Sequence, residues 1–154
     1  MMAPFRFLAR LRRDKAGTMM IETAIVTPVL ILMGLGAFQI SEVVARQTEL
    51  QNAAAEASGI ALASPPDTAA KRTILKNIIV TSTGLTADQV SVTEKFRCGS
   101  ATSYVDTASS CGSTKVGYFI LIQLDDTYTP IWTQWGISQP LRFNVDRYVM
   151  VKQA

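Results

Sequence analysis

Residues 15–38 read KAGTMMIETAIVTPVLILMGLGAF and give the N-terminal part of the chain its apolar character. From about Met19 to about Ile40 the sequence is nearly continuously apolar, and Glu22 is its one charged residue. A helix needs about 20 such residues, at about 1.5 Å each, to cross the hydrocarbon of a bilayer. We therefore expect a membrane-spanning helix over this stretch.

The basic residues of the chain are concentrated before this apolar run. The residues before Gly17 have a net charge of +4, from five basic side chains and Asp14, whereas the whole chain is only +3. This excess is a local orientation signal and not the footprint of a nucleic-acid binder. By the positive-inside rule, the leader stays in the cytoplasm and the rest of the chain lies beyond the span.

A cleavable secretory signal is an alternative explanation of the N-terminus. Its apolar core would be about 7–15 residues long and closely followed by a small-x-small cleavage site. Here the apolar run is longer, contains a carboxylate, and is followed by Ala53–Ala55 only far downstream. The pattern favours an anchor.

Glu22 is the most informative residue of the apolar run. A carboxylate at mid-bilayer costs on the order of 2–3 kcal/mol and usually has a partner. If the chain is cut after Gly17, Thr18 gains a charged amine four residues from Glu22, on the same face of the first turn. Glu22 would then neutralise this amine or that of a neighbouring subunit. The alternative is a carboxylate that snorkels to the interface and has no specific role.

Gly17-Thr-Met-Met-Ile-Glu22 resembles the cleavage motif of type IV prepilins. The wider stretch, residues 13–32, resembles the TadE-like family of tight-adherence (Tad) pilus systems, with its R-x-x-x-G-x-x-x-x-E-x-A-x-x-x-P pattern followed by aliphatic residues. The resemblance covers about the first quarter of the chain, and Thr23 stands where the family often has Phe or Tyr. It implies scission after Gly17 by an aspartyl prepilin peptidase and a role as a pseudopilin, a minor pilus component.

Pro28 fits this picture of an assembling helix. It removes one helical hydrogen bond and crowds the carbonyl of Ala24, so we expect a kink. Gly34 and Gly36 would let neighbouring backbones approach closely. Proline and glycine are also frequent in membrane helices generally, so both explanations stay open for these three residues.

Residues 41–64 are predicted to extend the membrane helix as a stalk. They are rich in Ala, Glu and Gln, which favour helix. We expect one helix from Thr18 to about Ala63, roughly 70 Å long, with a weak Arg46–Glu49 pair. The stalk carries a narrow apolar stripe of Val43, Leu50, Ala54, Ala57 and Ala61. Such a stripe suits close packing, and we expect it to pack on the sheet of the same chain rather than on a neighbouring subunit.

Residues 65–154 are predicted to form a small head. Pro65 and Pro66 end the first helix, and Asp67 would cap a second helix to about Ser82, with Ile74, Leu75 and Ile78 facing inward. Strands are expected over residues 89–97, 116–126 and 141–152, with a polar loop over 98–114. The fold class is α+β and pilin-like: a long N-terminal membrane-spanning helix packed on a small antiparallel sheet head. The domains would be 1–17 (leader), 18–40 (transmembrane helix), 41–64 (stalk) and 65–154 (periplasmic head).

The head offers little catalytic chemistry. Cys98 and Cys111 flank the polar loop and would form a disulfide in an oxidising space; a reactive thiol would need a basic neighbour that is not apparent. Asp125 and Asp126 alternate between strand faces and suggest a solvated strand end.

Trp132 and Trp135 are expected in the core, with the membrane surface or a partner as alternatives. The chain has no histidine, which removes the commonest general base and the commonest zinc ligand. We predict no catalytic residues, cofactor or metal.

The sequence thus predicts a minor pseudopilin of a Tad-type pilus, needed for pilus assembly, adhesion and surface attachment. Its expected partners are the membrane, the prepilin peptidase, other pilins and pseudopilins of the same system and the inner-membrane assembly platform, but no nucleic acid. We expect a single-pass inner-membrane protein with its N-terminus cytoplasmic and its head periplasmic, which enters the pilus on assembly. The alternatives are an uncleaved anchor carrying a periplasmic binding module, and an enzyme built on an unusual carboxylate site.

Overall fold

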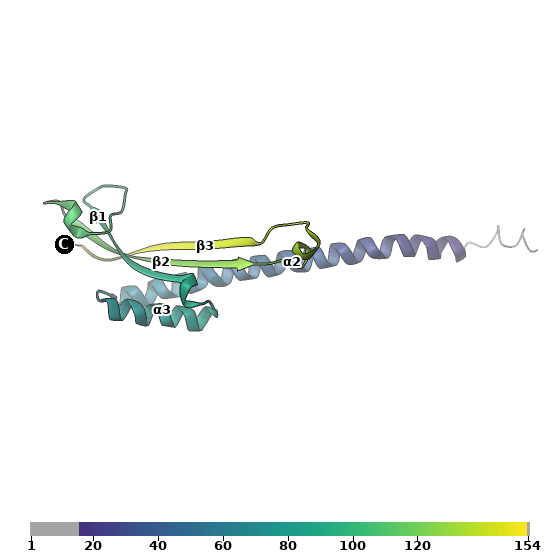
Figure 1. Cartoon of the computed structure of the whole chain (residues 1–154), viewed down its shortest axis with the longest axis horizontal. Helices are drawn as coiled ribbons and strands as arrows, with labels where there is room; N and C mark the ends of the chain where they lie inside the picture. The colour runs from purple at the N-terminus through teal and green to yellow at the C-terminus, as the bar shows by residue number, and fades with distance from the viewer. Residues whose placement is uncertain (1–15, 154) are drawn as a thin grey trace, which may run out of the picture. The chain divides into compact units, whose positions relative to one another are not determined.

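A computed structural model describes residues 16–153 of the chain (Figure 1). These residues form two compact units, residues 16–42 and residues 43–153, and the predicted leader residues 1–15 lie outside the described range. The elements in chain order are α2 (Ala16–Ala63), α3 (Ala69–Thr83), η1 (Ala87–Gln89), β1 (Val90–Cys98), η2 (Ala108–Cys111), β2 (Val116–Tyr128), η3 (Ile131–Trp135) and β3 (Leu141–Gln153). The predicted α+β class, with a long apolar N-terminal helix and a small antiparallel sheet, is confirmed.

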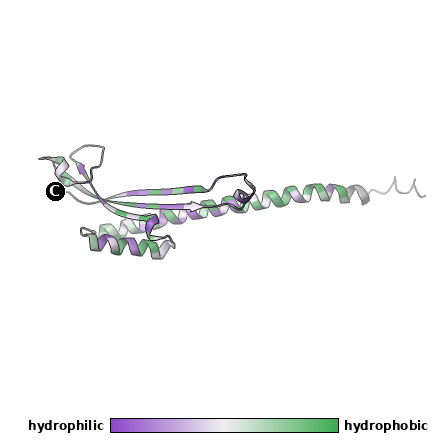
Figure 2. Ribbon diagram, in the orientation of Figure 1, coloured by the Kyte–Doolittle hydropathy of each residue, from purple (hydrophilic) through white to green (hydrophobic). Residues whose placement is uncertain are grey.

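Helix α2 runs without interruption from Ala16 to Ala63, through Pro28. It ends where the sequence places two prolines, which disfavour the helical conformation in the residue before them. The last turn closes with a hydrogen bond from the Ser64 amide to the Ile60 carbonyl (2.8 Å). In Figure 2 the N-terminal part of α2 is mostly coloured as hydrophobic, whereas its later turns alternate with polar residues.

The head, residues 43–153, contains a three-stranded antiparallel sheet in the order β1-β2-β3. Ile122 in the central strand lies opposite Val92 of β1 and Arg147 of β3. The run Phe119–Ile122 is buried on both faces of β2, as its β-branched and aromatic composition favours. The three predicted strands are confirmed: β1 is shifted by one residue toward the C-terminus, and β2 and β3 end two residues and one residue later than predicted.

One face of the sheet packs on the later turns of α2. The shared core contains Ile120, Ile122 and Leu124 of β2 together with the α2 stripe Leu50, Ala54, Ala57 and Ala61. The four stripe residues are almost wholly inaccessible, and three of them are alanines, which let the helix backbone come close to the sheet. The prediction that this stripe covers the chain's own sheet is confirmed for these four residues, whereas Val43, the fifth predicted member, is only partly buried and lies outside the core cluster.

Helix α3 is present, but two details of its prediction are wrong. Its N-cap is Thr68, whose hydroxyl accepts a hydrogen bond from the Lys71 amide (3.3 Å), while Asp67 instead pairs with the Lys71 ammonium (2.8 Å). Leu75 is buried as predicted, but Ile74 and Ile78 are exposed, and Ile79 is buried in their place. The helix packs through the neighbouring i, i+4 pair because that face meets the sheet core.

The other face of the sheet is covered by the loop after β1. Tyr104 packs edge-on against Phe119 (5.1 Å between ring centroids) and stacks on Tyr148 (4.2 Å). The Cys98–Cys111 disulfide, with a Cα–Cα distance of 5.1 Å, closes this loop and confirms the predicted pairing. Closing a loop of this length stabilises a fold by about 3 kcal/mol in the chain-entropy model.

Candidate assembly site

The first unit, residues 16–42, exposes nearly all of its large apolar side chains. Helix α2 from Met19 onward is long and apolar enough to cross a membrane. None of the residues in its most apolar stretch is buried by the rest of the chain. Apolar surface of this extent is typical of a segment whose surroundings are supplied by lipid or by other chains. The exposed side chains are Met19, Met20, Ile21, Ile25, Val26, Val29, Leu30, Ile31, Leu32, Met33, Leu35, Phe38 and Ile40.

Glu22 lies exposed among these apolar side chains. Gly17 and Thr18, the predicted cleavage pair, fall in the first helical turn of α2. Thr18 and Glu22 are four positions apart in this helix, so they lie on one face of it. This spacing is what a partnership between a new Thr18 amine and the carboxylate would require; the partnership itself stays a prediction.

Pro28 stands on a shallow apolar depression of the helix surface. The depression is lined by Met19, Met20, Thr23, Ala24, Thr27 and Pro28. The Thr23 hydroxyl donates a hydrogen bond to the Met19 carbonyl (2.8 Å), so this polar side chain is satisfied within its own helix. A helix face of small and flexible side chains is suited to packing against another helix in lipid.

In the head, Arg46 of α2 joins several elements. Its Nε donates to Asp126 Oδ2 at the end of β2 (2.6 Å), and its Nη1 donates to Glu49 Oε2 (2.9 Å) and to the Thr83 carbonyl of α3 (3.3 Å). Gln89 Nε2 adds a hydrogen bond to the other oxygen of Asp126 (3.2 Å). Partial burial alone would lower the pKa of Arg46, but the hydrogen bonds and charges of Asp126 and Glu49 outweigh it and raise that pKa.

This cluster corrects the expectation that Asp126 belongs to a solvated strand end. Asp125 is exposed as expected and accepts a hydrogen bond from Asn144 (2.6 Å), whereas Asp126 is mostly buried against Arg46. The sequence held one signal for it: Arg46 lies four residues before Leu50 and so continues the buried stripe of α2. An arginine in line with a core stripe needs a carboxylate partner.

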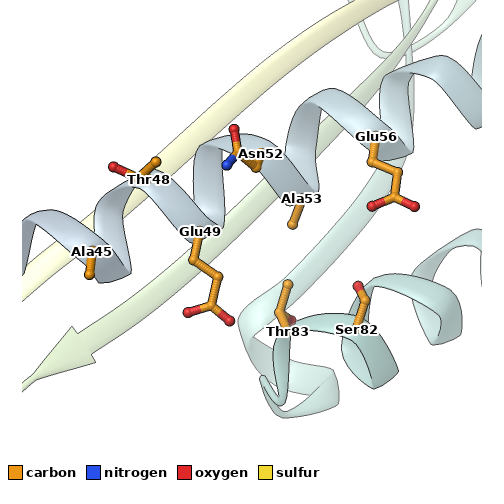
Figure 3. A pocket seen from close by; sticks show the side chains of 8 residues that line it. All are labelled: Ala45, Thr48, Glu49, Asn52, Ala53, Glu56, Ser82 and Thr83. Carbon is orange, nitrogen blue, oxygen red and sulfur yellow. The ribbon is translucent and has the colours of Figure 1, made fainter. Parts of the chain in front are cut away.

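Beside this cluster, a polar groove of about 520 Å³ lies between α2 and the end of α3 (Figure 3). Figure 3 shows the carboxylates of Glu49 and Glu56 extending from α2 toward Ser82 and Thr83. Within residues 16–153, His, Cys, Asp and Glu side chains form no group of three that could hold a metal ion. The groove provides polar surface and no arrangement of a nucleophile with a base.

These features define a protein that has, among residues 16–153, one candidate membrane helix, which lies near the N-terminus and continues into an α+β head. Residues 17–58 match the family model described as TadE-like protein, which confirms the resemblance carried by the N-terminal motif. The match begins at Gly17 and extends through the exposed apolar segment into the α2 stripe of the head. The matched family is associated with Tad pilus systems, so the match suggests a pilus-related protein. The chain matched no curated protein and no solved structure.

Proposed function

We propose that this protein is a minor pseudopilin of a Tad-type pilus, cut after Gly17 by a prepilin peptidase. The observation that carries the proposal is the family match, which starts at Gly17 and covers the exposed apolar helix. The length of the head, residues 43–153, favours a minor subunit that supports assembly and surface attachment.

Scission would change the charge balance of the anchor. It would remove the basic leader, and with it the strongest signal that holds the N-terminus in the cytoplasm. It would also create an amine at Thr18, which Glu22 could neutralise from the same helix face. An unpaired charge costs on the order of 2–3 kcal/mol at mid-bilayer and less near the edge, where Glu22 begins, so pairing would ease movement of Glu22 through the bilayer.

The proposed location is the inner membrane, with the leader in the cytoplasm and the head in the periplasm. The basic residues before Gly17 support this orientation. The Cys98–Cys111 disulfide supports a head that lies in an oxidising compartment. The proposed partners are the peptidase, the assembly platform, and other pilins and pseudopilins that would bury the apolar side chains of residues 19–40.

The test is to co-express the chain with a prepilin peptidase and to measure the intact mass of the membrane-bound product. The wild type should yield a chain that begins at Thr18, and Gly17→Ala should block this processing. Gly36→Ala is the matched control, because Gly36 lies in the same helix with nothing within 4 Å of an added Cβ. Recovery of only the full-length wild type would refute the proposal and support the uncleaved anchor.

A second comparison separates processing from assembly. Glu22→Gln removes the carboxylate within the apolar segment, whereas Glu42→Gln removes an exposed carboxylate after it. We expect Glu22→Gln to impair piliation more than processing, and Glu42→Gln to affect neither. Normal piliation in Glu22→Gln cells would remove the proposed role of this residue.

A further inference from the structure

The connection between β2 and β3 has an unusual composition. From Thr127 to Leu141 the chain has no charged residue, although charged residues, Asp126 and Arg142, flank this segment on both sides. Both tryptophans of the protein, Trp132 and Trp135, lie within it. Tryptophan with neutral apolar neighbours is characteristic of segments at the boundary between lipid and water.

The structure leaves Trp132 and Ile137 of this connection outside the core cluster. Ile137 is 73 % exposed and Ile131 is 49 % exposed, and Trp132 is only half-buried, so the expectation of a core position is wrong for Trp132. None of the residues that form the main hydrophobic core cluster of the head falls within residues 129–140. The Trp132 and Ile137 side chains therefore gain little from the main core and are available to other apolar surroundings.

The connection is nevertheless ordered at its base. The Pro130 side chain is fully buried, and its carbonyl accepts hydrogen bonds from the Thr133 amide (3.1 Å) and hydroxyl (2.7 Å). The Gly136 amide donates to the Thr133 carbonyl (3.1 Å), and the Ile137 amide donates to the Trp132 carbonyl (3.3 Å). Backbone groups that are already paired make entry into an apolar layer less costly.

The connection also lies at one defined end of the head. Strand β2 runs opposite to the α2 residues of the head (Figure 1), and the Arg46–Asp126 ion pair sets the end of β2 beside Arg46. Tyr128 lies two strand residues further on, about 7 Å at about 3.3 Å per residue, a distance that an α-helix covers in four to five residues. The connection thus begins near the N-terminal end of the head, whose first residue, Val43, is joined covalently to the apolar segment.

We infer that residues 129–140 form a second membrane contact, in which Trp132 and Ile137 enter the lipid–water interface on the head side of the bilayer. This inference rests on the proposal that residues 19–40 span a membrane, but not on cleavage or on pilus assembly. The occupant is a lipid surface, because the segment is uncharged and aromatic and emerges at the end of the head that the anchor ties to the membrane. Two attachment points would restrict rotation of the head before the subunit leaves the bilayer.

The test uses tryptophan fluorescence, since both fluorophores lie in the segment. The full-length Trp135→Phe protein, with Trp132 as its single tryptophan, is reconstituted in phosphatidylcholine vesicles. We expect a loss of emission when the lipids are brominated near the glycerol end of their acyl chains, and a smaller loss when the bromine lies near the chain terminus. Emission that is unchanged by either lipid would overturn the inference. Blue-shifted emission that is insensitive to bromine would also overturn it, by placing Trp132 against protein.

Two variants in the same background localise the contact. Ile137→Lys should reduce the loss of emission in brominated vesicles, because it places a charge at the most exposed apolar position of the connection. Ile74→Lys is the matched control: Ile74 is also an exposed isoleucine of the head, 59 % accessible, but lies on α3. Equal effects of the two lysines would contradict a specific contact. Gly17→Ala protein should behave as the wild type, so failed processing and failed lipid contact remain distinguishable.

Discussion

Asparagine in place of Asp126 tests whether the Arg46 cluster fastens the sheet to α2. The side chains of Arg46 and Asp126 are 24 % and 14 % exposed, so the pair falls between a surface ion pair, worth about 0–1 kcal/mol, and a buried one, whose disruption costs about 3–5 kcal/mol. We expect Asp126→Asn to lower the free energy of unfolding of the head by about 2 kcal/mol. For a domain of this size the melting temperature should fall by roughly 10 °C.

The assay is thermal and urea unfolding of the full chain in detergent, followed by tryptophan emission, which reports on the head alone. Glu49→Gln is the control, because Glu49 binds the same guanidinium but is 50 % exposed and should cost at most about 0.5 kcal/mol. Joint replacement of Arg46 and Asp126 by leucine should cost less than Asp126→Asn, because no charge is left without its partner. Equal, small effects of Asp126→Asn and Glu49→Gln would refute the assignment of Asp126 as the main anchor.

Three further predictions follow from the head. The hydrogen bond from the Lys71 ammonium lowers the pKa of Asp67 from its usual value of 3.8. The stabilisation from this pair is therefore present above pH 3.8 and is lost as the pH falls through the lowered pKa. A ¹³C titration of the Asp67 carboxyl group should show the lowered pKa, and Lys71→Met should raise it. Leu50→Ala should destabilise the head by about 2–5 kcal/mol in urea unfolding, because Leu50 is fully buried, whereas Val44→Ala on the exposed side of α2 should change it by less than about 0.5 kcal/mol. Removal of the disulfide by Cys98→Ser should cost about 3 kcal/mol, and a loss below about 1 kcal/mol would show that the loop is held by its aromatic contacts instead.

The sequence was most informative where the signal is local. The apolar run, the Gly17–Glu22 spacing and the β-branched run of β2 each lie within a short window, and they predicted the long helix, the family resemblance and the central strand. The disulfide was predictable because the chain has only two cysteines. These features need no knowledge of distant contacts.

The failed predictions concern long-range packing. Both Ile74/Ile78 and Leu75/Ile79 are apolar i, i+4 pairs of one helix, so periodicity alone does not choose which pair faces the sheet. Asp126 finds Arg46 across 80 positions of sequence, and adjacent aspartates at a strand end give no hint of that partner. The buried or exposed state of these residues depends on how the β1-β2-β3 sheet packs on α2 and α3.

The core of the head bears on how such a subunit could leave a membrane. Every residue of the hydrophobic core cluster, and every ion pair of the described residues, comes from position 46 or later in the chain. The apolar side chains of residues 19–40 contribute nothing to that core, so in the proposed assembly they would exchange lipid for the helices of neighbouring subunits without loss of the core contacts that stabilise the head. Because lipid and packed apolar side chains differ little in polarity, this exchange would be governed in the proposed assembly by close packing and by Glu22, the one charged residue among residues 19–40.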